Sequence, residues 1–480
     1  DLFLRMIASG EMSGTPEAHL HFISYPAGLL LSLLYRLFPS LPWYGLFLCS
    51  PFLLTETFVL SFLLRQIRSP AARFLAVALS GIVSCAFLFP HLASLQFTTS
   101  AGIAAAGALF LFSVSSPAVS FRETLKNHAG FFLLAACAFC IRDQVLYMSF
   151  PFIGVIWLSK YLDARKLPDS LSKSKKIISE NRCLFLPLPR QNSRQRNLLK
   201  LTLMFFSMLI SFLLIEKLAY RDSGWSSFRA YSAARASVYD YEGYPDYDAF
   251  ESVYQELGIS RSSYEGAAHR YSLLLDPAIN RHSMEVLKSI SSQDRGISLR
   301  QLQEKLSDMA EFFVERHLSD ADRPLNLLVY RCYLSFVICS LLSRKWRAFR
   351  DILFLCSARM AVWSYLIYHG RVPIRVSQTV YLAELAVLFA VALGYRLWLP
   401  DVSPQSKETA RGPRDPGQDR HLWQNICCSV WSLSLLFLLF TCLRSGVPNA
   451  KKTAEESIAR LQFSESFVHM KEYFSGRPDC

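Results

Sequence analysis

The sequence lacks the short motifs that mark many soluble enzymes. It contains no GxGxxG, Walker A, HExxH or GxSxG pattern and no internal repeat, so the usual evidence for a nucleotide site, a zinc peptidase or a serine hydrolase is missing. The acidic segment Tyr220–Arg323 contains none of the 12 cysteines, which excludes a disulfide scaffold there. What remains informative is where the apolar and charged residues lie.

Hydrophobic residues make up 52% of the chain and occur in long blocks with little amphipathic alternation. Blocks of about 18 or more apolar residues are typical of transmembrane helices. The fourth and fifth of the predicted blocks are short and flank Arg142-Asp143, which indicates one bent hairpin. The ten predicted spans are Trp43–Leu64, Arg73–Phe89, Leu95–Ser115, Gly130–Ile141, Val145–Ser159, Leu198–Leu218, Leu325–Leu342, Ile352–Tyr368, Val376–Leu397 and Leu422–Leu443.

The net charge of +13 is unevenly distributed. Lys160–Lys200 holds 11 Lys and Arg against 3 acids, whereas Tyr220–Arg323 holds 12 against 17. Such a contrast follows the rule that basic loops stay in the cytoplasm, and it disfavours nucleic acid as a partner. The sequence therefore predicts a multi-pass protein of the cell membrane whose large polar domain is extracytoplasmic.

The same rule predicts the topology. If the basic turn Arg65–Arg73 is cytoplasmic, Trp43–Leu64 descends from the outside, and alternation fixes the remaining turns. Ile23–Phe38 is too short to span and carries Pro26 and Arg36, so we expect a helix lying in the outer interface. The segments predicted to lie outside are the turn at His91, the turn at Arg142-Asp143, Tyr220–Arg323, His369–Arg375 and the C-terminal tail.

These patterns predict a mainly α protein, a polytopic transmembrane helix bundle with a mostly helical extracytoplasmic domain. Because the sequence begins with Asp1 and not Met, we expect a fragment that lacks one further N-terminal span. The predicted organisation is a first outer loop with a juxtamembrane helix (1–42), transmembrane helices with a basic cytoplasmic loop at 160–197 (43–219), an extracytoplasmic helical domain (220–323), more transmembrane helices (324–444) and an extracytoplasmic tail (445–480).

The polar segment Tyr220–Arg323 is rich in aromatic residues near its start. Aromatic side chains mixed with Asp and Arg suit the faces of sugars, but the tyrosines also suit the packing of a small domain on the membrane surface, and the sequence leaves both interpretations open. Apolar residues at three- and four-residue spacing predict a helix at Leu299–Leu318. Shorter helices are expected at Asp246–Leu257 and Ile279–Ile290.

Three ionisable residues lie well inside predicted spans, near their middle: Glu56, Arg359 and Glu384. A charge at mid-span is costly, so such groups face the bundle interior or water. One interpretation is a structural ion pair, either Glu56–Arg359 or Arg359–Glu384. The other is a substrate path through the membrane.

Several charged residues gather on the face predicted to be outside. Arg142 and Asp143 interrupt an apolar hairpin, Arg371 and Arg375 lie in one tight turn, and Asp1 opens the chain. Arginine is suited to bidentate contact with phosphate. These residues therefore predict a site for a lipid-borne phosphate, although interfacial arginines also bind ordinary lipid headgroups.

Two short segments of the sequence resemble those of a known family. The segment Ser9-Gly-Glu-Met-Ser-Gly-Thr-Pro-Glu17-Ala-His19 and the turn Gly370-Arg371-Val-Pro373-Ile-Arg375 are similar to those of bacterial multi-pass proteins of the GT-C superfamily, which are membrane glycosyltransferases. The resemblance implies a polyprenyl-phosphate-linked sugar as donor, membrane lipids as surroundings and a cell-envelope glycan or lipid as acceptor.

The resemblance also implies roles for individual residues. An acidic residue in the first outer loop is the hallmark of the superfamily, and Asp1 matches it as the catalytic base. Glu17, His19, Arg142, Asp143, Arg371 and Arg375 are the candidate substrate-binding residues. No residue is assigned to a metal, and a divalent cation at the leaving phosphate stays open as a cofactor.

Two other classes of function fit parts of the pattern. A transporter or flippase for a lipid-linked or polar solute would be expected to show inverted repeats, which the sequence does not contain. A non-catalytic protein of envelope assembly would tolerate other polar residues in place of Asp1 and the arginines. The glycosyltransferase is the function that the residues favour.

Overall fold

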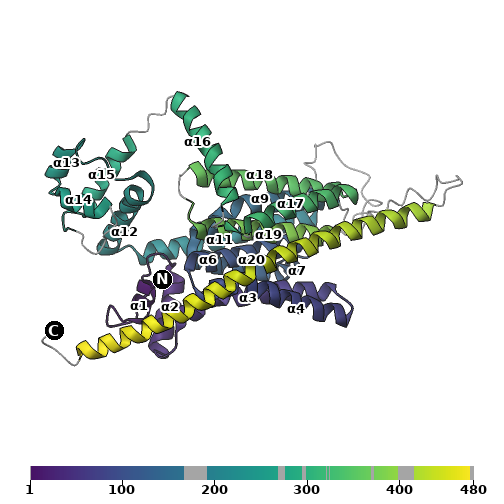
Figure 1. Cartoon of the computed structure of the whole chain (residues 1–480), viewed down its shortest axis with the longest axis horizontal. Helices are drawn as coiled ribbons and strands as arrows, with labels where there is room; N and C mark the ends of the chain where they lie inside the picture. The colour runs from purple at the N-terminus through teal and green to yellow at the C-terminus, as the bar shows by residue number, and fades with distance from the viewer. Residues whose placement is uncertain are drawn as a thin grey trace, which may run out of the picture. The chain divides into compact units, whose positions relative to one another are not determined.

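The computed structural model describes residues 2–166, 192–268, 276–293, 299–319, 322–323, 325–368, 372–397 and 416–475. The described residues form helices and contain no strand (Figure 1), as the predicted fold class requires. The chain divides into two compact units. Unit 1 comprises 1–212, 319–361 and 374–480, and unit 2 comprises 213–318 and 362–373.

Unit 1 is a bundle of apolar helices. Its helices are α1 (Leu2–Ser9), α2 (Tyr25–Leu37), α3 (Trp43–Gln66), α4 (Pro70–Phe87), α5 (Phe89–Ala93), α6 (Phe97–Val114), α7 (Phe121–Asn127), α8 (Ala129–Met148), α9 (Phe150–Lys166), most of α11 (Ser193–Ala219), α17 (Leu325–Leu342), most of α18 (Trp346–Tyr368), α19 (Ile374–Tyr395) and α20 (Pro416–Ser475).

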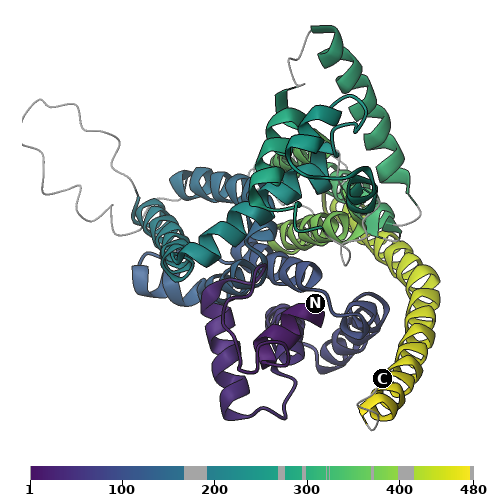
Figure 2. The same ribbon diagram turned by 90° about the vertical axis from the view of Figure 1, so that its left-hand side faces the viewer.

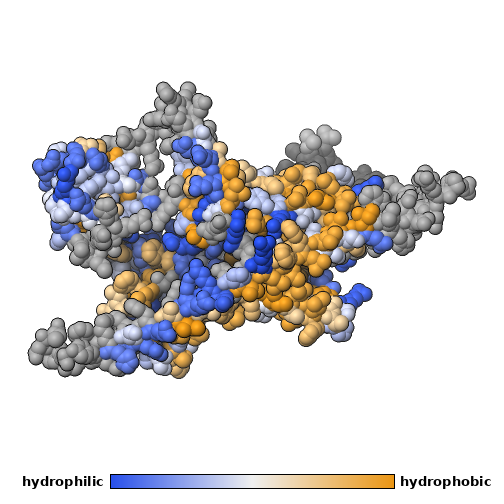
Figure 3. Space-filling model, viewed as in Figure 1, coloured by the Kyte–Doolittle hydropathy of each residue, from blue (hydrophilic) through white to orange (hydrophobic). Residues whose placement is uncertain are grey.

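Eight helices of the described chain are long and apolar enough to cross a membrane: α3, α6, α8, α11, α17, α18, α19 and α20. The hydrophobic surface over the bundle helices in Figure 3 is the surface that lipid would cover. The other two predicted spans correspond to α4, whose apolar part Pro70–Cys85 is short, and to α9, which has 17 residues. The expected count of ten spans therefore stays a prediction.

The central helix of the bundle is α6, which packs against α3, α8 and α19. Small residues allow these close approaches, as is common between membrane helices. A Cβ atom on Gly102 would collide with the side chain of Thr379 in α19, and one on Gly107 would lie 2.6 Å from Thr55 Oγ1 in α3. The helix is buried along almost its whole length, so it fixes the relative positions of its three neighbours.

Two boundaries differ from those predicted. The hairpin at Arg142 has no loop there: α8 continues through a kink to Met148, and α9 begins at Phe150 with Pro151 in its first turn, a favourable place for proline. The tail expected after Leu443 is helical, because α20 continues to Ser475 as one curved helix (Figure 2). Ion pairs four residues apart support this extension at Lys451–Glu455 and Lys452–Glu456.

Unit 2 is a small helical unit. It contains α12 (Ser223–Ala236), the π-helix η1 (Ser237–Glu242), α13 (Glu251–Glu256), α14 (Arg261–Ala268), α15 (Arg281–Gln293) and α16 (Leu299–Leu318). The helix expected at Leu299–Leu318 is present with the predicted bounds, and α13 and α15 lie within one to five residues of theirs. Its core includes Tyr247, Tyr254, Met284 and Leu287.

Candidate functional site

The first loop, residues 10–24, is folded back on α1 and α2. It begins at Gly10, whose positive φ of 85° suits glycine and ends α1. A Cβ at this position would also lie only 2.6 Å from the backbone of Thr15. Leu20 and Ile23 are buried, and Arg36 of α2 donates to Pro16 O at 3.2 Å. The loop is therefore anchored at both ends and in the middle.

Glu17 and His19 form a pair on this loop. His19 Nδ1 lies 2.6 Å from Glu17 Oε1, and the same oxygen accepts hydrogen bonds from the backbone N–H groups of Ala18 and His19. Burial would raise the pKa of the Glu17 carboxyl, but the hydrogen bonds from His19 and Ala18 lower it below its ordinary value. Glu17 is thus a carboxylate at neutral pH and orients the His19 ring.

The loop is bound to α8 where that helix is kinked. Arg142 has the extended backbone angles φ −160° and ψ 96°, so helical hydrogen bonding is interrupted there. Two nearby backbone groups have partners outside the helical pattern: Cys140 O accepts from Ser24 N at 2.9 Å, and Gln144 N donates to Asp143 Oδ1 at 2.8 Å. The kink and the loop satisfy each other's backbone groups.

The Arg142 side chain lies against the same loop. Its guanidinium carbon is 4.9 Å from the centre of the Phe22 ring and 5.4 Å from that of Phe97, and these two rings are stacked. Nη2 donates to Gln144 Oε1 at 2.7 Å. Contacts of a cation with aromatic faces are attractive, so they help to fix the position of the guanidinium.

Arg375 lies at this same end of the bundle. Helices α6 and α19 run parallel, because Gly102 packs on Thr379 near one end while Ser113 and Tyr395 line one cavity near the other. Arg375 is one turn before Thr379 and is exposed. We call this end, which carries Glu17, His19, Arg142, Asp143 and Arg375, the first-loop end.

The structure thus describes only part of the predicted site. The structure binds the loop that carries Glu17 and His19 to the kink that carries Arg142 and Asp143, through Ser24 and Phe22, and it places Arg375 at the same end. Asp143 caps Gln144 in the kink. Asp1 and Arg371 lie outside the described residues, so their place in the site stays a prediction.

The close contact between the loop and α2 predicts that a larger residue at this point lowers the stability of the protein. A Cβ on Gly28 would collide with the carbonyl of Ala18, which lies between Glu17 and His19. We expect Gly28→Ala to destabilise the protein by about 1–3 kcal/mol, the usual cost of overpacking. Gly45→Ala in α3 is the control, since a Cβ there meets nothing within 4 Å. Denaturant titrations in detergent should show Gly28→Ala alone unfolding early; equal midpoints for both variants would contradict the packing.

Two of the three charges predicted near mid-span, Arg359 and Glu384, form an ion pair. Arg359 of α18 is bonded to Glu384 of α19, and both side chains are buried. Arg359 also donates to Tyr330 OH at 3.2 Å and lies against the rings of Tyr330 and Tyr333. Of the two predicted pairs, Arg359–Glu384 is the one that forms, whereas Glu56 accepts a hydrogen bond from Ser80.

A second charged cluster was not predicted. At the opposite end of unit 1, Asp351 Oδ2 accepts from Ser159 at 2.7 Å and from Tyr395 at 2.6 Å, and Arg350 bonds both Asp351 and Asp163. We call this end, with Lys160 and Arg194 beside the network, the basic end. Its members come from four helices, so no local spacing indicates the cluster; the only signal is that each one lies at a span boundary.

Among the described residues, no three His, Cys, Asp or Glu side chains gather as a metal site would require. Glu17 and His19 alone do not make a ligand set. The divalent cation at the leaving phosphate stays a prediction.

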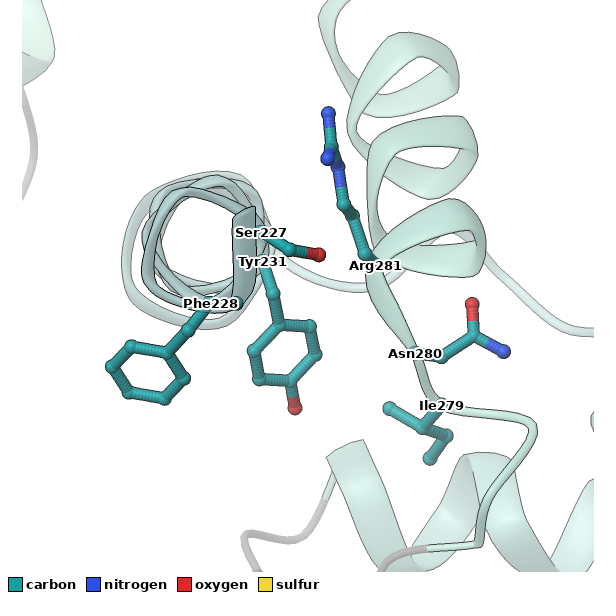
Figure 4. Close-up of a pocket in the computed structure, with 7 residues that line it drawn as sticks. Ser227, Phe228, Tyr231, Ile279, Asn280 and Arg281 are labelled. Atoms are coloured by element: carbon teal, nitrogen blue, oxygen red, sulfur yellow. The ribbon is translucent and has the colours of Figure 1, made fainter. Parts of the chain in front are cut away.

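Unit 2 has a shallow groove of about 450 Å³ between α12 and the start of α15. Figure 4 shows Tyr231 of α12 facing the side of the groove that carries Ile279 and Asn280. Phe228 is 42% exposed. Tyr231 and Tyr244 also pack against the core of the unit. Three further tyrosines form a cluster in and against this core, because the Tyr247, Tyr254 and Tyr264 rings lie 5.0–5.4 Å from one another. These three tyrosines therefore pack the interior of the unit, and the packing of the domain on the membrane surface stays a prediction.

Comparisons of the chain with protein-family models, curated proteins and solved structures give no match.

Proposed function

We propose that this chain is an integral-membrane glycosyltransferase that moves a sugar from a polyprenyl-phosphate carrier to a glycan or lipid acceptor. The observation that supports it most is the binding of the loop with the Glu17–His19 pair to the kink that carries Arg142. A carboxylate–imidazole pair and a phosphate-binding cation are the two elements that such a transfer needs. Both are held at the end of an apolar bundle, where a lipid carrier presents its headgroup.

The proposed reaction is a single inverting displacement. A carboxylate removes the proton from the acceptor hydroxyl, the oxygen attacks the anomeric carbon, and the bond from that carbon to the phosphate oxygen breaks. The polyprenyl phosphate leaves with the bonding electrons, and the base keeps the proton. Asp1 is the proposed base on the basis of the sequence, and the Glu17–His19 pair is proposed to hold the acceptor hydroxyl.

The cations are proposed to stabilise the leaving phosphate. Arg142 is held by its aromatic contacts before any ligand arrives, and a preorganised cation stabilises developing negative charge without reorganisation. Arg375 lies at the same end, and Arg371 is expected to act with it. The charge distribution supports a cell-membrane location with the first-loop end and the polar segment 220–323 on the extracytoplasmic side.

The test is a transfer assay with matched carboxylate variants. Membranes that contain the full chain are incubated with a panel of radiolabelled polyprenyl-phosphate sugars, and label in the acceptor fraction is measured. We expect Glu17→Gln to lower the initial rate about a hundredfold, the typical cost of a misplaced reacting group. Glu11→Gln is the control, because Glu11 is an exposed residue of the same loop and its carboxylate pairs with Arg5, on the side of the loop that faces α1.

Asp1→Asn tests the choice of base in the same assay. Loss of transfer at normal protein level is expected if Asp1 takes the proton. Full activity of Asp1→Asn combined with loss in Glu17→Gln would move the base to Glu17. No transfer above control membranes from any donor in the panel would overturn the proposed function.

A further inference from the structure

The basic end of unit 1 contains a cavity of about 310 Å³ that the proposed chemistry does not use. Helices α6, α9, α11, α18 and α19 contribute to it, and all of its lining residues belong to unit 1. The volume lies at the lower end of the range for small-ligand sites. It suits a headgroup with its first methylene groups and is too small for a whole lipid.

The walls of the cavity combine two kinds of surface. One part is apolar, lined by Val155, Ile156, Leu355, Val387, Ala390 and Val391. The other part is charged, lined by Lys160, Arg194, Asp163 and Asp351. A ligand that matches both parts is amphipathic, with a charged group at one end.

The sign of the required charge follows from the hydrogen bonds. The two carboxylates have hydrogen-bond partners within the network, because Arg350 bonds both Asp351 and Asp163 and Tyr395 donates to Asp351 at 2.6 Å. Lys160 Nζ donates to two backbone carbonyls, Ser113 O at 2.9 Å and Ser115 O, which carry no net charge. The cluster thus holds three cations against two anions, an excess of one positive charge.

Arg194 gives a second, independent observation. It lies in the first turn of α11, where Gln195 and Asn197 attach the helix to the neighbouring chain through Tyr161 O and Ala118 O. Its Nε is buried, and no hydrogen-bond partner for it is found among the described residues. A buried guanidinium nitrogen without a partner carries a desolvation cost that an anionic ligand would remove.

The position of the cavity along the helices identifies the source of the anion. Asp351 lies in the second turn of α18 and Tyr395 is the last residue of α19, so the cavity is at the level where apolar spans end. Lipid phosphates lie at this level, and a phosphodiester carries one negative charge. We propose that this cavity binds the headgroup of an anionic membrane phospholipid, with Lys160 and Arg194 contacting the phosphate region and the apolar wall contacting the first methylene groups.

The test compares two lipids and two arginines. The purified full chain in neutral detergent is titrated with dioleoyl phosphatidylglycerol or dioleoyl phosphatidylcholine, and bound lipid is counted by native mass spectrometry. We expect phosphatidylglycerol to bind about tenfold more tightly, and Arg194→Gln to remove that preference. Arg196→Gln is the matched control, because Arg196 is exposed two residues away and does not line the cavity.

Gly394→Leu provides a second variant that changes no charge. Gly394 lines the cavity, and a Cβ there meets nothing within 4 Å, so a leucine should fill the space and block lipid while the helix stays intact. Equal binding by wild type, Arg194→Gln and Gly394→Leu would overturn the proposal, as would equal affinity for the two lipids. Displacement of phosphatidylglycerol by millimolar inorganic phosphate would assign the site to a free anion and overturn the lipid assignment.

Discussion

Arg142→Gln is expected to lower the rate of sugar transfer by about a hundredfold to a thousandfold. The proposed role of Arg142 is to stabilise charge on the departing phosphate, and removing one preorganised donor of this kind typically costs that much in kcat. Glutamine is polar but carries no charge, and it cannot make the bidentate contact. The measurement is the initial rate of transfer from a labelled polyprenyl-phosphate donor at matched protein levels.

Two further variants make this result specific. Arg142→Lys keeps the charge but loses the planar fork, so an intermediate rate is expected. Arg5→Gln removes an exposed arginine of the N-terminal region that is paired with Glu11, and its rate should equal that of wild type. A wild-type rate for Arg142→Gln would show that Arg142 holds the kink and does not contact the donor.

Arg359→Met is expected to destabilise the protein by about 3–5 kcal/mol. The substitution leaves Glu384, which is 1% exposed, as an uncompensated carboxylate inside the bundle, and breaking a buried pair on one side typically costs this amount. Unfolding by denaturant in mixed micelles, followed by tryptophan fluorescence, measures the change.

The matched double variant separates the pair from its surroundings. Arg359→Met with Glu384→Leu removes both charges, and replacing a buried pair by apolar residues is often neutral or stabilising. We therefore expect the double variant to recover most of the lost stability. Arg73→Met is the control, because Arg73 is exposed and donates to Ile67 O at the start of α4. A double variant as unstable as Arg359→Met would contradict this account of the pair.

The bundle could be predicted because the composition of a long apolar block indicates by itself that the block spans a membrane. Eight of the predicted spans coincide with helices long and apolar enough to cross a membrane. Charges within such blocks must find partners, which is why the Arg359–Glu384 pair was one of only two predicted pairs. The bend at Arg142 was visible for a similar reason, since a charged pair interrupts an apolar hairpin.

Other features depend on contacts between segments far apart in the chain, and such contacts have no local pattern in the amino-acid sequence. The contact of Ser24 with Cys140 connects residues far apart in the sequence, and so does the cluster of Asp163, Arg350 and Tyr395. Helix α1 was missed because its eight residues are too few to show a period. The long continuation of α20 was missed because a polar helix beyond a span looks like a tail in composition.

The most direct test of the central claim is to map where the carrier binds. The full chain in liposomes is irradiated with a photoreactive polyprenyl phosphate, and the labelled peptides are identified by mass spectrometry. Labelling of the first loop and of the segment around Arg142 is expected, and it should fall sharply in Arg142→Gln but not in Arg5→Gln. Labelling confined to peptides of the basic end, or identical labelling in Arg142→Gln and wild type, would contradict a carrier site at the first-loop end.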